Sequence, residues 1–254
     1  MKSSDTTQNS PGNSKENVQT RSQDNPLGYE KESKLLVGFA IPCIISMLVT
    51  ALYNIVDQIF IGQGVGYLGN AATNVAFPLT TICLAITLLI SIGSASRFSL
   101  SLGEGDADRA AQAVGNALAM MVLFGILYTL CIEIFLVPLL NAFGATQDVL
   151  PYAIEYTRIT AVGMPLLIIT NGMSNLARAD GSPNYSMMCM LIGAIINTIL
   201  DPLFIFKFHM GVRGAAFATV IGQFFSFLMA LYYVKKFTHI RLKKQHFILK
   251  PQVC

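Results

Sequence analysis

The chain has 254 residues, of which 53% are hydrophobic and only 12% are charged, with a mean hydropathy of +0.56 and a net charge of +3. Soluble domains typically carry about 25% charged residues, so the composition excludes an ordinary soluble domain and predicts an integral membrane protein. The sequence shows no nucleic-acid motif, Gly-rich phosphate loop or metal spacing among its five cysteines. We therefore expect no nucleic-acid partner, no cofactor and no disulfide framework.

Three units are predicted along the chain. Residues 1–33 are polar and lack an apolar stretch, which indicates a disordered cytoplasmic tail rather than a cleaved signal peptide. Residues 34–236 are expected to form a membrane lobe. Residues 237–254 are expected to be a basic cytoplasmic segment at which the chain is truncated.

Six apolar segments lie within the predicted lobe, each close to the ~20 residues that a membrane-spanning helix needs. They are roughly 35–61, 74–100, 116–140, 156–176, 185–206 and 214–234. Between them, Asp106 or Asp108 is expected to cap a short amphipathic stretch, and 141–148 is expected to be a loop. Gly181 should end one helix and Ser182–Pro183 begin the next. The fold class is therefore an all-α membrane protein with a six-helix bundle.

The basic residues predict the orientation of the bundle. Fourteen of the seventeen Lys and Arg residues lie either before the first span or after the second, fourth or sixth span, which places them on one side of the membrane. Only three lie after an odd-numbered span, on the other side. The positive-inside rule then predicts a multi-pass plasma-membrane protein with both termini in the cytoplasm.

Three acidic residues fall inside predicted spans: Asp57, Glu133 and Asp201. A charge at mid-membrane costs about 2.5–3.5 kcal/mol on insertion scales, so such residues are functional candidates. Span directions place Asp57, Asp201 and Thr219 at one depth in the outer leaflet, and Asn197 shares a helix face with Asp201. Two carboxylates, a carboxamide and a hydroxyl suit H+ or Na+.

Structural alternatives stay open. Either acid could instead bond a neighbouring helix, and Glu133 is as consistent with a structural bond as with a functional role. Thr50 and Tyr53 share the Asp57 face and, with Asn54, are candidates for a solute cavity or for coupling, although Asn54 also suits an ordinary interhelical bond. The many Met and Phe residues would suit varied apolar ligands.

Two prolines are expected to shape the helices near these acids. Pro42 should kink the first span in its inner half. Pro202 removes the amide that would bond the Thr198 carbonyl and so frees a backbone oxygen beside Asp201. Interrupted helices near an ion site are a recurring feature of transporters.

Four stretches carry a family resemblance: PCIISMLVTALYNIVDQIFIGQ, GSASRFSLSLGEGDADRAAQAVGNAL, LARADGSPNYSMMCMLIGAIINTILDPLFIF and MGVRGAAFATVIGQ. Together they resemble the first six helices of multidrug and toxic compound extrusion (MATE) transporters, over residues ~33 to 250. The resemblance implies a cation-coupled antiporter, driven by H+ or Na+, that exports small amphipathic organic solutes. The resemblance further implies a twelve-helix protein made of two six-helix lobes.

The resemblance also implies roles for individual residues. The amino-lobe cation site of one branch of the family is matched by Asp57, Asn197, Asp201 and Thr219. The kinking proline and the tyrosine one turn before the first acid are matched by Pro42 and Tyr53. Since only six spans are present, the second lobe is expected either in a longer protein or as a second copy of the chain.

Three other functions are alternatives to this one. An intramembrane aspartyl protease would need Tyr-Asp and Gly-x-Gly-Asp signatures, whereas this chain has IVD and ILD, so it is not expected to be an enzyme. A lipid-linked saccharide flippase of the same superfamily would be expected to carry Arg or Lys inside its spans. The third alternative is a fragment that does not transport.

Overall fold

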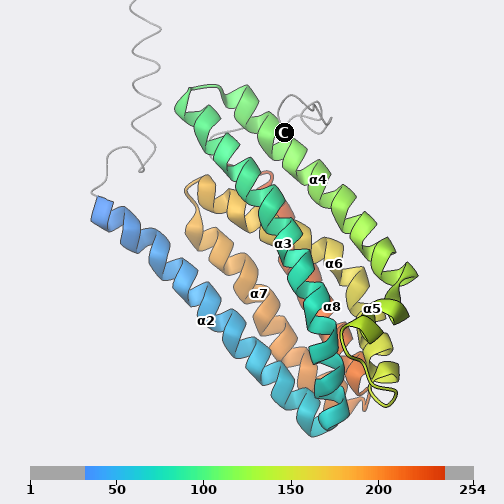
Figure 1. The fold of residues 1–254 in the computed structure, drawn as a ribbon. Helices are drawn as coiled ribbons and strands as arrows, with labels where there is room; N and C mark the ends of the chain where they lie inside the picture. The colour runs from blue at the N-terminus through green and yellow to red at the C-terminus, as the bar shows by residue number, and fades with distance from the viewer. Residues whose placement is uncertain (1–31, 238–254) are drawn as a thin grey trace, which may run out of the picture.

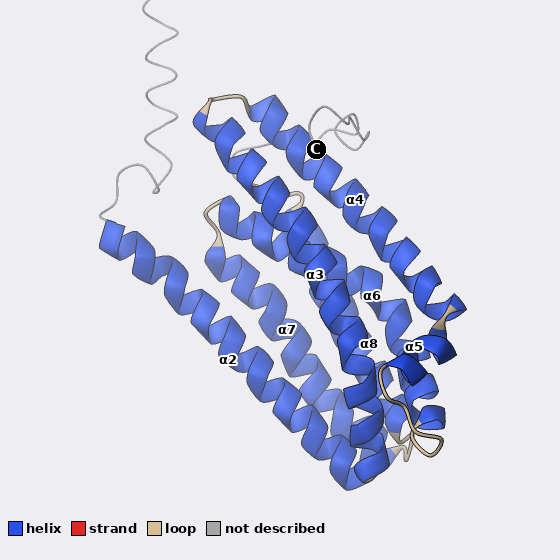
Figure 2. Cartoon of the chain, viewed as in Figure 1, coloured by secondary structure: helices blue, strands red, loops and turns tan. Residues whose placement is uncertain are grey.

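The computed structural model describes residues 32–237, and within this range every regular element is helical (Figures 1 and 2). The elements are α2 (Glu32–Gly64), α3 (Tyr67–Gly103), α4 (Ala107–Ile134), α5 (Leu136–Ala142), α6 (Leu150–Ala179), α7 (Pro183–Pro202), the π-helical segment η2 (Leu203–Lys207) and α8 (Val212–Tyr233). The predicted tail and most of the predicted basic segment lie outside the described residues.

Six of the described helices are long and apolar enough to cross a membrane, so the predicted all-α six-helix bundle is confirmed. The spans are longer than predicted, because α3 begins at Tyr67 rather than 74 and α4 at Ala107 rather than 116. The prediction that residues 116–140 form a single helix is wrong. The chain bends at Phe135, and the short α5 follows α4.

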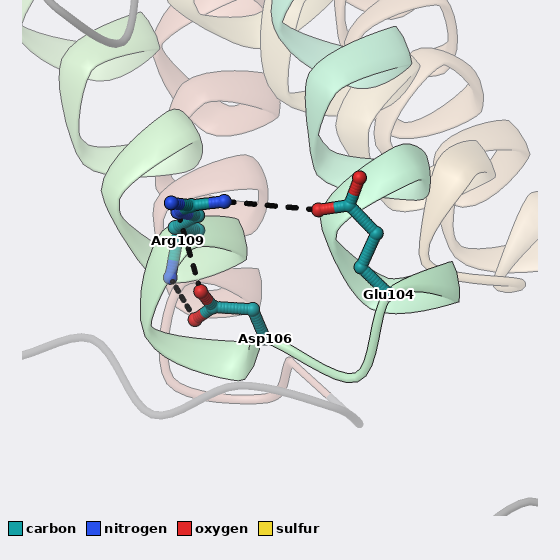
Figure 3. A network of polar contacts seen from close by, with 3 residues as sticks. All are labelled: Glu104, Asp106 and Arg109. Carbon is teal, nitrogen blue, oxygen red and sulfur yellow. Dashed lines mark hydrogen bonds and ion pairs between the residues drawn. The ribbon is translucent and has the colours of Figure 1, made fainter.

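The turn between α3 and α4 carries a small network of charged side chains (Figure 3). Asp106 is the cap of α4, and its Oδ1 accepts a hydrogen bond of 3.0 Å from the Arg109 backbone N–H. The Arg109 guanidinium lies 3.3 Å from Asp106 and 3.8 Å from Glu104. These exposed ion pairs add little stability, but the cap fixes where α4 begins. The short amphipathic stretch expected before residue 116 is instead the beginning of α4.

Helix α6 lies at the centre of the bundle, in contact with α3, α4, α7 and α8 (Figure 1). Its close approach to α4 depends on Gly125, since a Cβ there would lie 3.0 Å from the Cα of Pro165. Helix α2 lies at the edge, where it packs mainly on α7 and meets α3 chiefly near their shared turn. One face of α2 therefore has no cover within the described bundle.

The prolines act differently in α2 and α7. Helix α2 continues through Pro42, whose carbonyl accepts a hydrogen bond of 2.7 Å from the Ser46 hydroxyl. The bend expected at Pro42 stays a prediction. At Pro202 the α-helical pattern stops and η2 follows directly, as expected where a ring replaces a backbone donor. This irregular backbone adjoins Asp201.

Candidate cation and solute site

The predicted site residues lie at one level near the end of the bundle that holds the α2–α3 turn. Asp57 is seven residues before the end of α2, Asp201 six before the end of η2, and Thr219 seven after the start of α8. At about 1.5 Å per residue, each lies roughly 10 Å from the helix end. The shared depth inferred from span directions is thus present in the folded bundle.

The two carboxyl groups meet in the interior. Asp57 is 7% exposed and Asp201 is fully buried, and each acts on the other electrostatically. Oδ1 of Asp57 is buried without a hydrogen-bond partner. Within residues 32–237 neither carboxyl forms a salt bridge. Buried carboxylates normally have a cationic partner, so this pair has the charge and geometry to take up a small cation or a proton.

Asn197 connects α7 to α8 beside the acids. Its Nδ2 lies 3.3 Å from Oδ1 of Asp201 and 3.3 Å from Oγ1 of Thr219. With the amide turned over, Nδ2 lies 3.0 Å from Oδ2 of Asp201, and the amide oxygen lies 3.2 Å from the Thr219 backbone nitrogen. Either orientation joins the same three residues. The amide therefore orients the Asp201 carboxylate.

Tyr156 belongs to this cluster and was missed from the sequence. It lies six residues after the start of α6, hence at the same depth, and interacts with both carboxyls and with Thr219. In the predicted span it was a terminal residue, and Thr160, the polar residue one helical turn later, was not recognised as its neighbour. Counting residues from the true start of α6 would have placed Tyr156 at the depth of the two acids.

A cavity of about 320 Å³ opens between α2, α3, α6, α7 and α8 beside this cluster. Asp57, Asn197 and Thr219 form part of its wall, as do the predicted cavity residues Thr50, Tyr53 and Asn54. Asp201 does not line the cavity, but its neighbours Asn197 and Thr219 do. Apolar side chains complete the wall: Phe77, Leu84, Met164, Leu167 and Met190. Such a mixed wall can hold an amphipathic molecule of modest size.

Glu133 lies apart from this site. Near the end of α4 its carboxylate pairs with Arg158 on α6 at 3.6 Å, and both side chains are partly exposed. Of the two roles left open for Glu133, the structure shows the structural bond.

A family model described as MatE matches residues 42–203, a range that contains the α2 and α7 site residues. The chain belongs to the MatE family. It is 26% identical to a probable multidrug resistance protein, YoeA, of Bacillus subtilis over 84% of this chain and 48% of the relative. It is 30% identical to an FAD transporter of Shewanella oneidensis over 78% of this chain and 44% of that protein.

Solved structures agree with this assignment. The outward-facing conformation of a multidrug resistance MATE transporter matches with a TM-score of 0.80 and 27% identity, over 87% of this chain and 49% of that one. A MOP superfamily transporter from Pyrococcus furiosus matches with a TM-score of 0.80 and 28% identity, over 87% and 49%. The MATE resemblance seen in the sequence is confirmed.

The chain spans about half the length of the curated relatives it matches. The relatives are described as a probable multidrug resistance protein, an FAD transporter and a multidrug export protein, which supports the prediction that the chain is not an enzyme.

Proposed function

We propose that this chain forms one lobe of a cation-coupled antiporter that exports small amphipathic organic solutes across the plasma membrane. The observation that carries the proposal is the buried pair Asp57–Asp201, with an Asp57 oxygen that has no hydrogen-bond partner beside a solute-sized cavity. A buried acid without a cationic partner is costly unless an ion or a proton neutralises it.

The coupling step follows from this arrangement. With the carboxylates unneutralised, the cavity holds the solute next to Asp57. Entry of H+ or Na+ from the outside neutralises the pair, while Asn197 and Thr219 hold Asp201 in register. Helix α2, which carries Asp57 and packs on only part of its surface, then bends at Pro42 and contracts the cavity. The solute leaves outward as the cavity shrinks.

The orientation needed by this scheme comes from the basic residues, with both termini in the cytoplasm. The site then lies in the outer leaflet, where an inward-moving ion can reach it. Alternating access requires a second bundle against which this one moves. A carboxy-terminal lobe in a longer protein, or a second copy of the chain, would supply it.

Two alternatives remain distinct proposals. A lipid-linked saccharide flippase would hold a pyrophosphate with basic side chains, and the cavity wall formed by the described residues has no Lys or Arg. A fragment that does not transport would leave the Asp57–Asp201 pair without a role.

The deciding experiment replaces each acid with its amide, Asp57→Asn and Asp201→Asn, in the complete transporter. Efflux of a fluorescent organic cation from energised cells is measured, and protein level and thermal stability are recorded. We expect at least a ten-fold loss of efflux at equal protein level. The control Asp148→Asn changes an exposed loop carboxylate and should export normally. Normal efflux by either site variant would overturn the proposal.

A further inference from the structure

Four side chains from three helices meet at the end of the bundle opposite the buried acids. Nδ2 of Asn175 on α6 donates a 2.6 Å hydrogen bond to the hydroxyl oxygen of Ser91 on α3. The Arg178 guanidinium donates to Oδ1 of Asn175, and its Nη1 lies 3.9 Å from Sγ of Cys43 on α2. These four residues, the Arg178 network, lie beside the α6–α7 turn, whereas the acids lie toward the α2–α3 turn (Figure 1). No step of the proposed function uses them.

The Arg178 network continues the wall of the solute cavity on each of its three helices. One cavity-lining residue per helix lies seven positions from a network residue: Thr50 on α2, Leu84 on α3 and Asn171 on α6. Residues seven apart share a helix face, and two turns span about 10 Å. In all three helices the network residue is the one farther from the acids. The network therefore forms the inner end of the cavity.

Arg178 gives this inner end a positive charge. Within residues 32–237 no carboxylate forms a salt bridge with its guanidinium, whose contacts are a carboxamide and a thiol. The acids are too distant to neutralise it, because Tyr156 at their level lies 22 residues earlier on α6, about 33 Å away. Basic residues at helix ends commonly face lipid headgroups, but this part-buried side chain reaches across the bundle to α2. Its charge therefore lies on the path between the cavity and this end of the bundle.

We propose that Arg178 is an electrostatic barrier that keeps the coupling cation from passing from the acids, through the cavity, to the cytoplasm. A fixed positive charge repels H+ and Na+ alike, and arginine excludes protons and cations in this way in membrane pores. Asn175 and Ser91 are positioning residues, because they hold the guanidinium in place. Without the barrier, the cation would run down its gradient with no solute exported. The inference rests on the proposed function, because it concerns the same cation and the same orientation in the membrane.

The barrier is compatible with entry of solute from the cytoplasm. The guanidinium is joined to α6 and α3 through hydrogen bonds to nitrogen and oxygen atoms, but to α2 only through the Cys43 sulfur, which is a weak acceptor. Cys43 directly follows Pro42, where the proposed bend of α2 occurs. Helix α2 can move away with little loss and leave the guanidinium on α6 and α3. An amphipathic solute then enters beside α2 rather than past the charge.

Cation leak in the absence of solute tests the barrier. The complete transporter is reconstituted into proteoliposomes under an H+ or Na+ gradient, and a trapped ion-sensitive dye records cation influx. Arg178→Gln should raise this leak at least ten-fold, whereas Arg178→Lys keeps the charge and should stay within three-fold of the unmodified protein. Arg109→Gln is the matched control, because it removes a 70% exposed positive side chain near the same end of the bundle. An unchanged leak in Arg178→Gln, or an equal rise in either of the other two variants, would overturn the barrier.

A double variant tests whether the leak passes the acids. Adding Asp57→Asn to Arg178→Gln removes one of the carboxylates to which the cation binds, so the leak should return to the unmodified rate. A leak that persists in the double variant overturns the proposed path.

Chemical restoration of the charge keeps the test valid if Arg178→Gln folds poorly. Arg178→Cys is made in a version of the complete transporter without other cysteines, and the purified protein is divided before reconstitution. One portion reacts with a positively charged methanethiosulfonate and the other with a neutral one of similar size. The charged portion should leak at least five-fold less than the neutral portion. Equal rates overturn the barrier.

The positioning role has its own measurement. Ser91→Ala removes the hydroxyl that holds Asn175, so the guanidinium should be placed less firmly and the leak should rise about two- to five-fold. Thr81→Val is the control, because it removes an exposed α3 hydroxyl that bonds only to its own helix. A leak in Ser91→Ala equal to that of Thr81→Val overturns the positioning role.

The two proposals fail separately, because one is measured as export and the other as leak. If Asp57→Asn abolishes export but Arg178→Gln does not leak, the antiporter stands and the barrier falls. If Asp57→Asn exports normally, the antiporter proposal itself falls.

Discussion

Asn197 on α7 and Thr219 on α8 are hydrogen-bonded beside the buried Asp201 carboxylate, through Nδ2 and Oγ1 at 3.3 Å in one amide orientation and through the Thr219 backbone N–H and the amide oxygen at 3.2 Å in the other. The bond fixes the distance between two helices at the level of both acids. Since α8 contributes no charge to the cluster, this hydroxyl is its main polar contribution to the proposed cation site.

Replacing Thr219 with Val should weaken the binding of the coupling ion without abolishing transport. The change keeps the shape and removes one oxygen, and a neutral hydrogen bond contributes about 0.5–1.5 kcal/mol, which corresponds to roughly a two- to thirteen-fold change in affinity. The measurement is the external H+ or Na+ concentration that gives half-maximal export. Thr81→Val should leave this value unchanged, and an unchanged value in Thr219→Val would remove Thr219 from the site.

Glu133→Gln should export at the normal rate. The carboxylate pairs with Arg158 at 3.6 Å on the surface, and exposed ion pairs contribute about 0–1 kcal/mol. Efflux and thermal stability of the purified variant provide the check, with Asp57→Asn as the inactive reference. Loss of export in Glu133→Gln would contradict the structural role seen here.

Gly125→Ala should destabilise the bundle. The new methyl group would lie 3.0 Å from the Cα of Pro165, so α4 and α6 must separate, at a cost of about 1–3 kcal/mol for an overpacked interior. Thermal unfolding in detergent measures the loss. Gly93→Ala is the matched control on α3, because a Cβ there meets nothing within 4 Å. Equal melting temperatures for the two variants would contradict the close approach.

Tyr233→Phe should weaken the end of the bundle where α8 meets the α6–α7 turn. The Tyr233 hydroxyl donates a 2.7 Å hydrogen bond to Oδ2 of Asp180, and both residues are 2% exposed. Removing a donor to a buried carboxylate costs about 1–3 kcal/mol, while the ring keeps its packing on Tyr185. Melting curves should show the loss, whereas Tyr232→Phe, at a 63% exposed neighbour, should behave as the unmodified protein.

Much of the fold could be predicted from local sequence. Apolar length determined the number of spans, and Gly181 with Pro183 marked the end of α6 and the start of α7. The break at Phe135 was missed, because the apolar run continues through it and hydropathy does not distinguish one helix from two. The true helix ends extend past the apolar runs, since capped polar turns such as the one at Asp106 stay helical outside the hydrocarbon.

The sequence by itself determined that two acids, Asp57 and Asp201, must lie at one depth in a helical membrane bundle, because helix rise and span direction fix depth. It did not determine which helices are neighbours. Only the tertiary structure placed Tyr156 beside both acids, put Asp201 behind the cavity wall, and brought Gln58 to Thr73 across the α2–α3 seam. Those contacts depend on how each helix is rotated and packed, and packing at sites such as Gly62 and Gly125 is a property of pairs of helices rather than of either sequence segment alone.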